Sequence, residues 1–443
     1  MLKFGTDGVR GVANLDLTPE VVVALGRAAA RVLPSWRFVV GRDTRRSGPL
    51  LEAALVAGLT SEGVDVTLLG VAPTPAVAWV AATQGIAGAV ISASHNPFED
   101  NGVKLFGAGG RKLDDETEAA LEAELHRLLR HEATASARTG DAVGTVVDGR
   151  PDLGHWARAV AGSIAGRRLD GLRIVVDLAH GAASEVGPAL LRSLGADVTV
   201  LHAAPDGTNI NAGCGSTHPE ELQRVVVEQG ATAGIALDGD ADRALAVDAD
   251  GRLIDGDQII AITAIDRRDA GTLIDDTVVV TVMTNLGFRL GMADHGIKVL
   301  EVPVGDRYVL EALADGGLSL GGEQSGHVIF TDQATTGDGL LTAVQLLDVV
   351  ARSGRPLAEL ADAAMTRLPQ VLRNVRVDRA GADVAAALSA QVAEVEAELG
   401  ERGRVLIRAS GTEPLVRVMV EAPTAAQAEA AAERLCEAVE GHS

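Results

Sequence analysis

A serine follows an apolar run in the stretch "GAVISASHNPFEDNGVKLF", which spans residues 88–106. Ser94 is followed directly by His95 and Asn96, and Lys104 comes later in the same stretch. A serine in this position either caps a helix or carries chemistry through its hydroxyl group. Because a free hydroxyl is a poor nucleophile, the second alternative requires activating groups from elsewhere in the chain.

Three aspartates alternate with small residues in "LDGDADRALAVD", residues 237–248. In an extended or looped backbone, alternate residues project to the same side, so the carboxylates of Asp238, Asp240 and Asp242 can converge. Convergent anions repel one another unless a cation neutralises them, and a hard divalent ion such as Mg²⁺ is the candidate. A solvated acidic turn would show the same pattern. An EF-hand is not expected, since its bidentate glutamate is absent.

A glycine-containing stretch, "LGGEQSGHVIF" (residues 320–330), places Glu323, Ser325 and His327 close together in sequence. Glu and Ser side chains on one loop can hydrogen-bond to the hydroxyls of a sugar or to an amine. His327 can hold or move a proton near neutral pH. A glycine-rich turn with a surface histidine is the alternative interpretation.

The stretch "IRASGTEPLVRV", residues 407–418, is rich in groups that can bind phosphate, although the chain is acidic overall. These groups belong to Arg408, Ser410, Gly411, Thr412 and Arg417. Guanidinium forks, hydroxyls and backbone N–H groups freed by glycine suit a phosphate. An ordinary turn would explain Gly411 but not both arginines. Arg10, in "FGTDGVRGVA", either contacts a phosphate or belongs to a turn.

Helical and strand patterns alternate along most of the chain. A helix over residues 18–33 is predicted to begin with Thr18 as its N-cap and Pro19 at its first position. Short apolar runs bounded by Gly or Asp predict strands at residues 37–43, 63–69, 85–92, 172–178, 195–201, 231–238 and 277–283. This alternation is typical of βαβ units with largely parallel sheets.

The last part of the chain differs, because a strand, a long helix over residues 381–400, two strands and a final helix predict a small α+β domain. We therefore expect four domains. The expected divisions are 1–150 with the Ser94 loop, 151–252 with the aspartates, 253–368 with Glu323 to His327, and 369–443 with the phosphate loop.

Composition limits the function. The chain has 443 residues, of which 47% are hydrophobic and 2% aromatic, and its formal charge is −22. Such an acidic chain is not expected to bind nucleic acid. It has 2 cysteines, which predicts neither a disulfide framework nor a zinc site. No signal peptide and no membrane-spanning run is recognised, so we expect a soluble, cytoplasmic protein.

Five of these stretches, taken in order, resemble motifs of the α-D-phosphohexomutase superfamily. They are "GTDGVRG", "ISASHNP", "DGDADR", "GGEQSGH" and "RASGTEP". The resemblance implies three α/β domains with mixed, largely parallel sheets and a smaller C-terminal domain around a central cleft. "GGEQSGH" is similar to the branch that interconverts glucosamine 6-phosphate and glucosamine 1-phosphate. Phosphoglucomutase/phosphomannomutase activity is the alternative within the superfamily.

The resemblance also implies roles for individual residues. Ser94 would be the phosphoserine, and Mg²⁺ would be held by Asp238, Asp240, Asp242 and an oxygen of that phosphoserine. Lys104, Arg10 and His327 are the candidates for proton transfer, while His95 and Asn96 would support the loop. The substrate would be held by Arg243, Glu323, Ser325, Arg408, Ser410, Gly411, Thr412 and Arg417. Glucosamine 1,6-bisphosphate would be the intermediate and activator.

Other classes of protein fit less well. A serine hydrolase would need a base facing Ser94; His95 is expected to project elsewhere, and the G-x-S-x-G motif is absent. A kinase or ATPase would need a G-x-x-x-x-G-K-[ST] loop, which is also absent. A non-catalytic phosphosugar-binding protein would not need Ser94, the three aspartates and Lys104 together. The sequence does not decide between a monomer and a homodimer.

Overall fold

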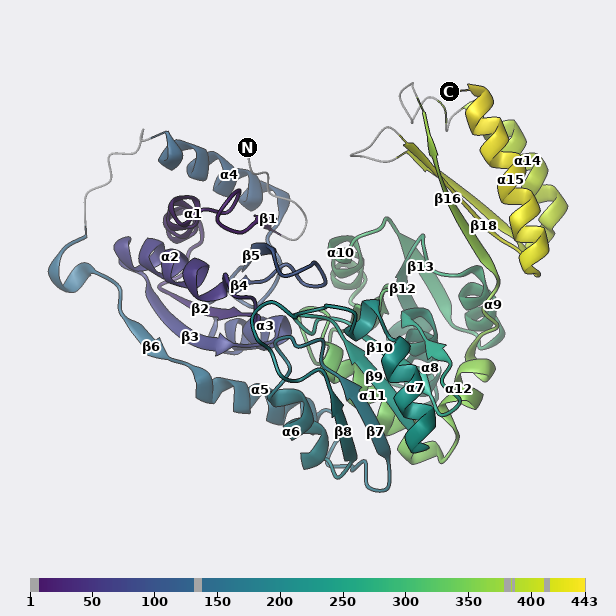
Figure 1. Cartoon of the computed structure of the whole chain (residues 1–443), viewed down its shortest axis with the longest axis horizontal. Coiled ribbons are helices and arrows are strands. Elements are labelled where there is room, and N and C mark those ends of the chain that lie inside the picture. Colours follow the sequence, from purple (N-terminus) through teal and green to yellow (C-terminus); the bar gives the residue numbers. More distant parts are fainter. Residues whose placement is uncertain (1–7, 131–137, 378–383, 385–386, 410–414, 443) are drawn as a thin grey trace. The chain divides into compact units, whose positions relative to one another are not determined.

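The computed structural model describes residues 8–130, 138–377, 384, 387–409 and 415–442 (Figure 1). The chain divides into two compact units. The first contains Met1–Val282 and Leu300–Ala361, and the second contains Met283–Val299 and Asp362–Ser443. Among the described residues, three sheets belong to the first unit and one belongs to the second. This confirms the expected fold class of three α/β domains with mixed sheets plus a smaller C-terminal domain.

The first sheet has six strands in the order β1-β5-β4-β2-β3-β6. Its strands are β1 (Val9–Val12), β2 (Arg37–Arg42), β3 (Asp65–Val71), β4 (Ala87–Ile91), β5 (Asp100–Phe106) and β6 (Val146–Asp148). Its helices are α1 (Pro19–Val32), α2 (Gly48–Ser61), α3 (Thr74–Gln84), α4 (Asp115–Leu129) and α5 (Arg150–Gly162). Strand β2 runs parallel to β3 and β4, whereas β5 runs antiparallel to β4 and β1. The sheet is therefore mixed.

The predicted cap of the first helix is confirmed. The Thr18 Oγ1 atom accepts a hydrogen bond from the Val21 N–H at 3.4 Å, and Pro19 occupies the first helical position. Helix α1 buries a face of Val, Ala and Leu side chains against α2 and the sheet. A core with so few aromatic residues relies on close packing of small aliphatic side chains.

The second sheet has the order β11-β10-β9-β7-β8. Its strands are β7 (Arg173–Asp177), β8 (Asp197–Leu201), β9 (Ala233–Leu237), β10 (Ala244–Asp248) and β11 (Leu253–Ile254), with helices α6 (Val186–Ser193) and α7 (Glu220–Gln229). Strand β7 is parallel to β8 and β9. Strands β10 and β11 form a hairpin, and Gly251 in its turn has a φ of +85°.

The third sheet has the order β13-β12-β14-β15. Its strands are β12 (Thr277–Thr281), β13 (Lys298–Val302), β14 (Leu320–Gly322) and β15 (Val328–Phe330). The helices in this part of the chain are α8 (Gly256–Asp269), α10 (Asp306–Gly316), α11 (Gly339–Ser353) and α12 (Leu357–Ala364).

Short 3-10 turns occur in several parts of the chain, at Gly140–Ala142, Gly215–Thr217, Ile274–Asp276 and Gly400–Arg402.

The second unit has an antiparallel sheet in the order β16-β18-β17, with α14 and α15 lying side by side along it (Figure 1). Its elements are α9 (Leu286–Asp294), β16 (Gln370–Arg376), α14 (Ser389–Leu399), β17 (Arg404–Ala409), β18 (Leu415–Glu421) and α15 (Ala425–His442). The helix predicted over residues 381–400 is described as α14, and part of its first half lies outside the described residues. Among the described helices, none is long and apolar enough to cross a membrane.

Candidate active site around Ser94

Ser94 lies in a loop between β4 and β5 and caps no helix, because the residues that follow it form turns. Its backbone has a φ of +50°, and only 2% of the residue is exposed. A left-handed conformation is costly for a residue other than glycine, so surrounding contacts must hold it. The Ser94 N–H donates to Ser92 Oγ at 2.9 Å, and the Ser94 Oγ–H donates to Asp238 Oδ2 at 2.5 Å.

The loop between β9 and β10 brings the three predicted aspartates together. One carboxylate oxygen of each residue lies within 4.8 Å of the others, and all three residues are buried. The two loops meet closely, since a Cβ atom on Gly239 would lie 2.6 Å from the Ser94 carbonyl oxygen. Glycine at this position therefore allows the aspartates to approach Ser94.

The hydrogen bonding of the aspartates fits a divalent cation. Asp238 Oδ1 accepts from the Arg243 N–H at 3.2 Å, and Asp240 Oδ2 accepts from Thr74 Oγ1 at 2.6 Å. Within the described part of the chain, Asp240 Oδ1 and Asp242 Oδ1 are buried without a hydrogen-bond partner. Buried carboxylate oxygens without donors are rare unless an ion satisfies them, and oxygen ligands suit Mg²⁺.

Two basic side chains partly neutralise the aspartates. Lys104 Nζ, on β5, lies 3.3 Å from Asp242 Oδ2 and 3.7 Å from Asp240 Oδ2, and Arg243 Nε lies 3.9 Å from Asp242 Oδ1. Burial, together with the neighbouring carboxylates, raises the pKa of Asp238 well above its ordinary value. Burial opposes ionisation of Asp242 as well, but the charges of Lys104 and His327 outweigh it and hold its pKa well below the ordinary value.

His327 is buried beside the aspartates and is not a surface residue, since only 2% of it is exposed. Its Nδ1 lies 3.7 Å from Asp242 Oδ2, and its Nε2 lies 3.6 Å from Asp306 Oδ2. Burial disfavours the imidazolium, but the Asp242 carboxylate outweighs burial and raises the pKa of His327. His327 can therefore carry a proton beside the carboxylate cluster.

His95 corrects one expectation. We expected it to project away from Ser94, but its Nδ1 lies 3.5 Å from Ser94 Oγ and 3.4 Å from Arg243 Nη1. The left-handed backbone of Ser94 departs from the extended geometry in which adjacent side chains point to opposite sides. Burial, followed by the charges of Arg243 and Arg10, lowers the pKa of His95, which favours the neutral ring.

Arg45 was not recognised from the sequence, although it organises the Ser94 loop. It is fully buried, and its Nε donates to Asp43 Oδ2 at 2.8 Å. The Arg45 guanidinium also donates to the backbone carbonyls of Ser94, Asn96, Pro97 and Asp100. One side chain thus donates to three carbonyls of the loop and to the carbonyl of Asp100, the first residue of β5. Polar residues at the end of β2 were a signal, but the pattern does not reveal which arginine is buried.

Asn211 is a second residue that sequence reasoning missed. Its Nδ2 donates to the carbonyls of Ser94 at 2.8 Å and of Asn96 at 3.1 Å. The predicted supporting residue Asn96 itself donates to Asp100 Oδ2 at 2.9 Å. Arg10 lies on β1 opposite Gly102 of β5, the strand that carries Lys104. These residues therefore belong to the surroundings of Ser94.

The loop between β14 and β15 carries Glu323 and Ser325. Glu323 Oε1 accepts from the Gly305 N–H at 3.2 Å, and the Glu323 N–H donates to the His327 carbonyl at 3.0 Å. Ser325 Oγ is buried and has no hydrogen-bond partner among the described residues. A hydroxyl in this state is suited to binding a polar ligand.

The phosphate-loop residues lie in the second unit. Arg408 on β17 is directly opposite Arg417 on β18, so both side chains project from the same face of the sheet. Like charges in this arrangement repel, and an anion between them would relieve the repulsion. Three further predicted residues, Ser410, Gly411 and Thr412, lie outside the described residues.

Comparison with known proteins matches four successive family models. They describe phosphoglucomutase/phosphomannomutase α/β/α domain I at residues 1–131, domain II at 156–251, domain III at 255–368 and the C-terminal domain at 372–438. Together these models extend over most of the chain.

Individual proteins agree with this family. The chain is 56% identical to a phosphoglucosamine mutase of Frankia casuarinae, covering 98% of this chain and 97% of that protein. It is 54% identical to a phosphoglucosamine mutase of Salinispora tropica, covering 98% of both. A Burkholderia thailandensis phosphoglucomutase/phosphomannomutase family structure has a TM-score of 0.83 at 27% identity, covering 100% of this chain and 98% of that one. The chain therefore belongs to the phosphoglucosamine mutase family of the α-D-phosphohexomutase superfamily.

Proposed function

We propose that this isomerase interconverts glucosamine 6-phosphate and glucosamine 1-phosphate, with Ser94 carrying the phosphoryl group between substrates. The observation that carries the proposal is the position of Ser94 Oγ, 2.5 Å from one of three buried, convergent carboxylates. Relatives at 54–56% identity are named phosphoglucosamine mutases, which supports the choice of sugar. The product would supply amino-sugar precursors for the bacterial cell wall.

Asp238, Asp240 and Asp242 would hold Mg²⁺ together with an oxygen of phosphorylated Ser94. When bound, the ion would act as a Lewis acid and neutralise charge on the phosphoryl oxygens. Asp240 Oδ1 and Asp242 Oδ1, which are buried without a hydrogen-bond partner among the described residues, support this assignment. Lys104, beside the same carboxylates, adds positive charge near the transferring group.

In the first transfer, the P–O bond to Ser94 breaks and a P–O bond to the sugar's free hydroxyl forms. The sugar hydroxyl loses its proton to a base of the site, and the Ser94 oxygen gains one. The product of this step is glucosamine 1,6-bisphosphate. After the bisphosphate reverses its orientation, its other phosphoryl group returns to Ser94 by the same step in reverse. We assign proton transfer to Lys104, Arg10 and His327, and His327 suits this role because it lies buried beside Asp242.

The rest of the sugar would be held by two groups of residues. Arg243, Glu323 and Ser325 would contact the sugar and its phosphoryl group. The non-transferring phosphate would bind to Arg408, Ser410, Gly411, Thr412 and Arg417. We further propose that the four domains divide at residues 150, 252 and 368, so that each contributes one loop. The enzyme would work in the cytoplasm without nucleic acid or membrane partners.

The decisive experiment compares kcat/KM for glucosamine 6-phosphate, glucose 6-phosphate and mannose 6-phosphate, with Mg²⁺ and the matching bisphosphate present. We expect the amino sugar to be preferred by at least about tenfold, because Glu323 can interact with its amine. Preference for glucose or mannose phosphate would instead assign phosphoglucomutase/phosphomannomutase activity. Turnover of none of the three would contradict the proposal.

Mass spectrometry of the purified protein tests the role of Ser94 separately. The wild type should carry one phosphoryl group on the peptide containing Ser94, and Ser94→Ala should lose both this mass and turnover. Ser325→Ala is the matched control, because it should keep the phosphoryl group while weakening substrate binding. Near-normal turnover by Ser94→Ala would rule out the mechanism.

A further inference from the structure

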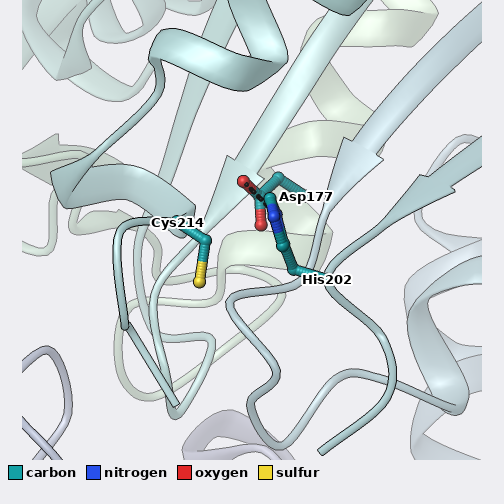
Figure 2. Close-up of side chains that lie close together, drawn as sticks. All are labelled: Asp177, His202 and Cys214. Atoms are coloured by element: carbon teal, nitrogen blue, oxygen red, sulfur yellow. Dashed lines mark ion pairs between the residues drawn. The ribbon is translucent and has the colours of Figure 1, made fainter. Parts of the chain in front are cut away.

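A second cluster of metal-ligating side chains lies at the carboxyl ends of β7 and β8. It consists of Asp177, His202 and Cys214, and one ligand atom of each lies within 4.8 Å of the others (Figure 2). Asp177 is the last residue of β7, His202 directly follows β8, and Cys214 precedes a short 3-10 turn. Asp177 and Cys214 are fully buried, and 19% of the His202 side chain is exposed.

The histidine is held in a particular orientation. His202 Nε2 lies 3.3 Å from Glu221 Oε2. The Nδ1 atom lies 3.0 Å from Asp177 Oδ2, at ion-pair distance (Figure 2). His202 Nδ1 is buried and makes no hydrogen bond within the described part of the chain. If Nε2 carries its proton toward Glu221, the Nδ1 lone pair points at a carboxylate oxygen. A cation bound by both atoms would remove this repulsion.

This arrangement resembles the usual surroundings of a metal-bound histidine, in which the second ring nitrogen donates to a carboxylate and fixes the tautomer. Glu221 would be that outer carboxylate. The 3.0 Å separation between Nδ1 and Oδ2 is also close to the separation of roughly 3.4 Å expected for two ligands about 2.1 Å from one tetrahedral zinc ion.

The other two side chains complete the donor set. Asp177 is fixed by N–H donors from Ala179 to Oδ1 and from Gly215 to Oδ2, both at 2.9 Å. Each carboxylate oxygen keeps a second lone pair that can bind a metal. Cys214 adds a sulfur atom, which disfavours Mg²⁺ and favours a softer ion. Together, one nitrogen, one oxygen and one sulfur suit zinc.

We propose that Asp177, His202 and Cys214 form a site for Zn²⁺ or a similar divalent transition metal, with water in the fourth position. Binding replaces the Cys214 S–H proton with the metal and releases that proton to solvent. The site fixes both ends of the segment from His202 to Cys214. Asn211 lies within this segment and donates to the carbonyls of Ser94 and Asn96, so the metal would stabilise the support of the Ser94 loop.

Cobalt titration of the full-length, chelator-treated protein tests the proposal. Excess Mg²⁺ is included so that the Asp238 cluster is occupied by the harder ion. We expect one equivalent of Co²⁺ to produce a thiolate-to-cobalt charge-transfer band in the near ultraviolet, and Zn²⁺ to abolish it. Cys214→Ser should lose the band. Cys436→Ser is the matched control and should retain it, because Cys436, the other cysteine of the chain, lies in the second unit.

His202→Gln provides a second test that leaves both thiols in place. We expect its Co²⁺ affinity to fall by at least the roughly 10- to 100-fold that loss of an outer partner of a metal ligand costs, because His202 would be a direct ligand. Circular dichroism confirms that the variant is folded. The proposal is overturned if the wild type shows no charge-transfer band at stoichiometric Co²⁺. It is also overturned if the band persists in folded Cys214→Ser, or if folded His202→Gln binds Co²⁺ as tightly as the wild type.

Discussion

Arg45 illustrates how a single side chain can determine the geometry of a catalytic loop. The loop of Ser94 has a left-handed residue and several carbonyls that no helix or strand satisfies. A buried guanidinium presents donors in several directions at once, and Asp43 balances its charge at 2.8 Å. Lysine has the same charge but concentrates its donors at one atom, so it cannot replace this network.

Arg45→Lys is therefore expected to lower kcat by about 10- to 100-fold, because Ser94 Oγ would shift relative to the three aspartates. The melting temperature should also fall, since buried carbonyls lose their donors. Steady-state kinetics and calorimetry measure both effects. Arg46→Lys changes the exposed neighbouring residue and should behave like the wild type. Equal kcat for Arg45→Lys and Arg46→Lys would contradict the positioning role.

Sequence reasoning found Ser94 and the aspartates because each lies in a short local pattern. Convergence of Asp238, Asp240 and Asp242 follows from their alternation in one loop, and the structure confirms it. Arg45 and Asn211 were missed because they reach the Ser94 loop from positions 49 and 117 residues away in sequence. Local spacing does not report such contacts. The number of cysteines predicted no zinc site, because it does not show that Cys214 lies beside Asp177 and His202.

At the scale of secondary structure, the short apolar strands and their order were predictable, whereas their exact ends were not. The strand expected at residues 63–69 is Asp65–Val71, because parallel pairing with β2 sets its limits more than its own pattern does. Helix α1 was predictable from Thr18 and Pro19, which act locally. The sequence predicted two successive strands at β17 and β18. It did not predict their register, which places Arg408 directly opposite Arg417.

Arg417→Gln is expected to raise the KM for the phosphosugar about tenfold or more, because it removes a charge-assisted hydrogen bond to phosphate. The free enzyme should be as stable as the wild type or slightly more so, since a like-charge pair is removed. KM measurements and thermal melts together distinguish a role of Arg417 in phosphate binding from a structural role. Arg376→Gln, an exposed arginine on β16, serves as the control. An unchanged KM would argue against phosphate binding at β17–β18.

An ion pair links helices α1 and α4. Glu124 on α4 contacts Arg127 at 2.7 Å and Arg31 of α1 at 2.8 Å. The Arg127 hydrogen bond, supported by Arg31, lowers the pKa of Glu124 to about 2. A lowered pKa contributes stability above the unfolded-state pKa, and this contribution is lost as the pH falls toward the folded-state value.

Glu124→Gln should therefore reduce the free energy of unfolding by about 1 kcal/mol at neutral pH. The difference from the wild type should shrink as the pH falls from about 5 to about 3, where the unfolded chain takes up the proton first. Urea unfolding at several pH values measures the free energy of unfolding of both proteins and hence this difference. Glu122→Gln, on the same helix, controls for the loss of one negative charge. A difference independent of pH would show that packing, not charge, is responsible.

On the scale of the whole molecule, the second unit is built from two separate segments of chain. Glu421 of β18 is fully buried and joins them, accepting from Asn285 Nδ2 at 3.1 Å and from the Leu286 N–H at 3.0 Å. The same carboxylate accepts from Arg404 Nε at 3.0 Å. The segment from Met283 to Val299 is therefore part of the hydrogen-bonded core of the second unit.

Glu421→Gln is expected to destabilise the second unit by about 3 kcal/mol, because Arg404 loses its charged partner in a buried position. Hydrogen exchange should become faster for amides of α9 and β16–β18 and remain unchanged for β7–β10 of the first unit. Glu437→Gln, an exposed residue of α15, is the control. A uniform increase in exchange over both units would contradict this expectation.

The division of the second unit has a consequence during synthesis. Helix α9 leaves the ribosome before residues 300–361. Strand β18, whose Glu421 accepts hydrogen bonds from Asn285 and Leu286, emerges only after those residues. Because chains fold from the N-terminus as they are made, the first unit can form while α9 still awaits its partner. A chain that terminates before Glu421 leaves α9 permanently without that partner and exposes its apolar side chains to chaperones and proteases. The folded second unit thus requires that translation has passed Glu421.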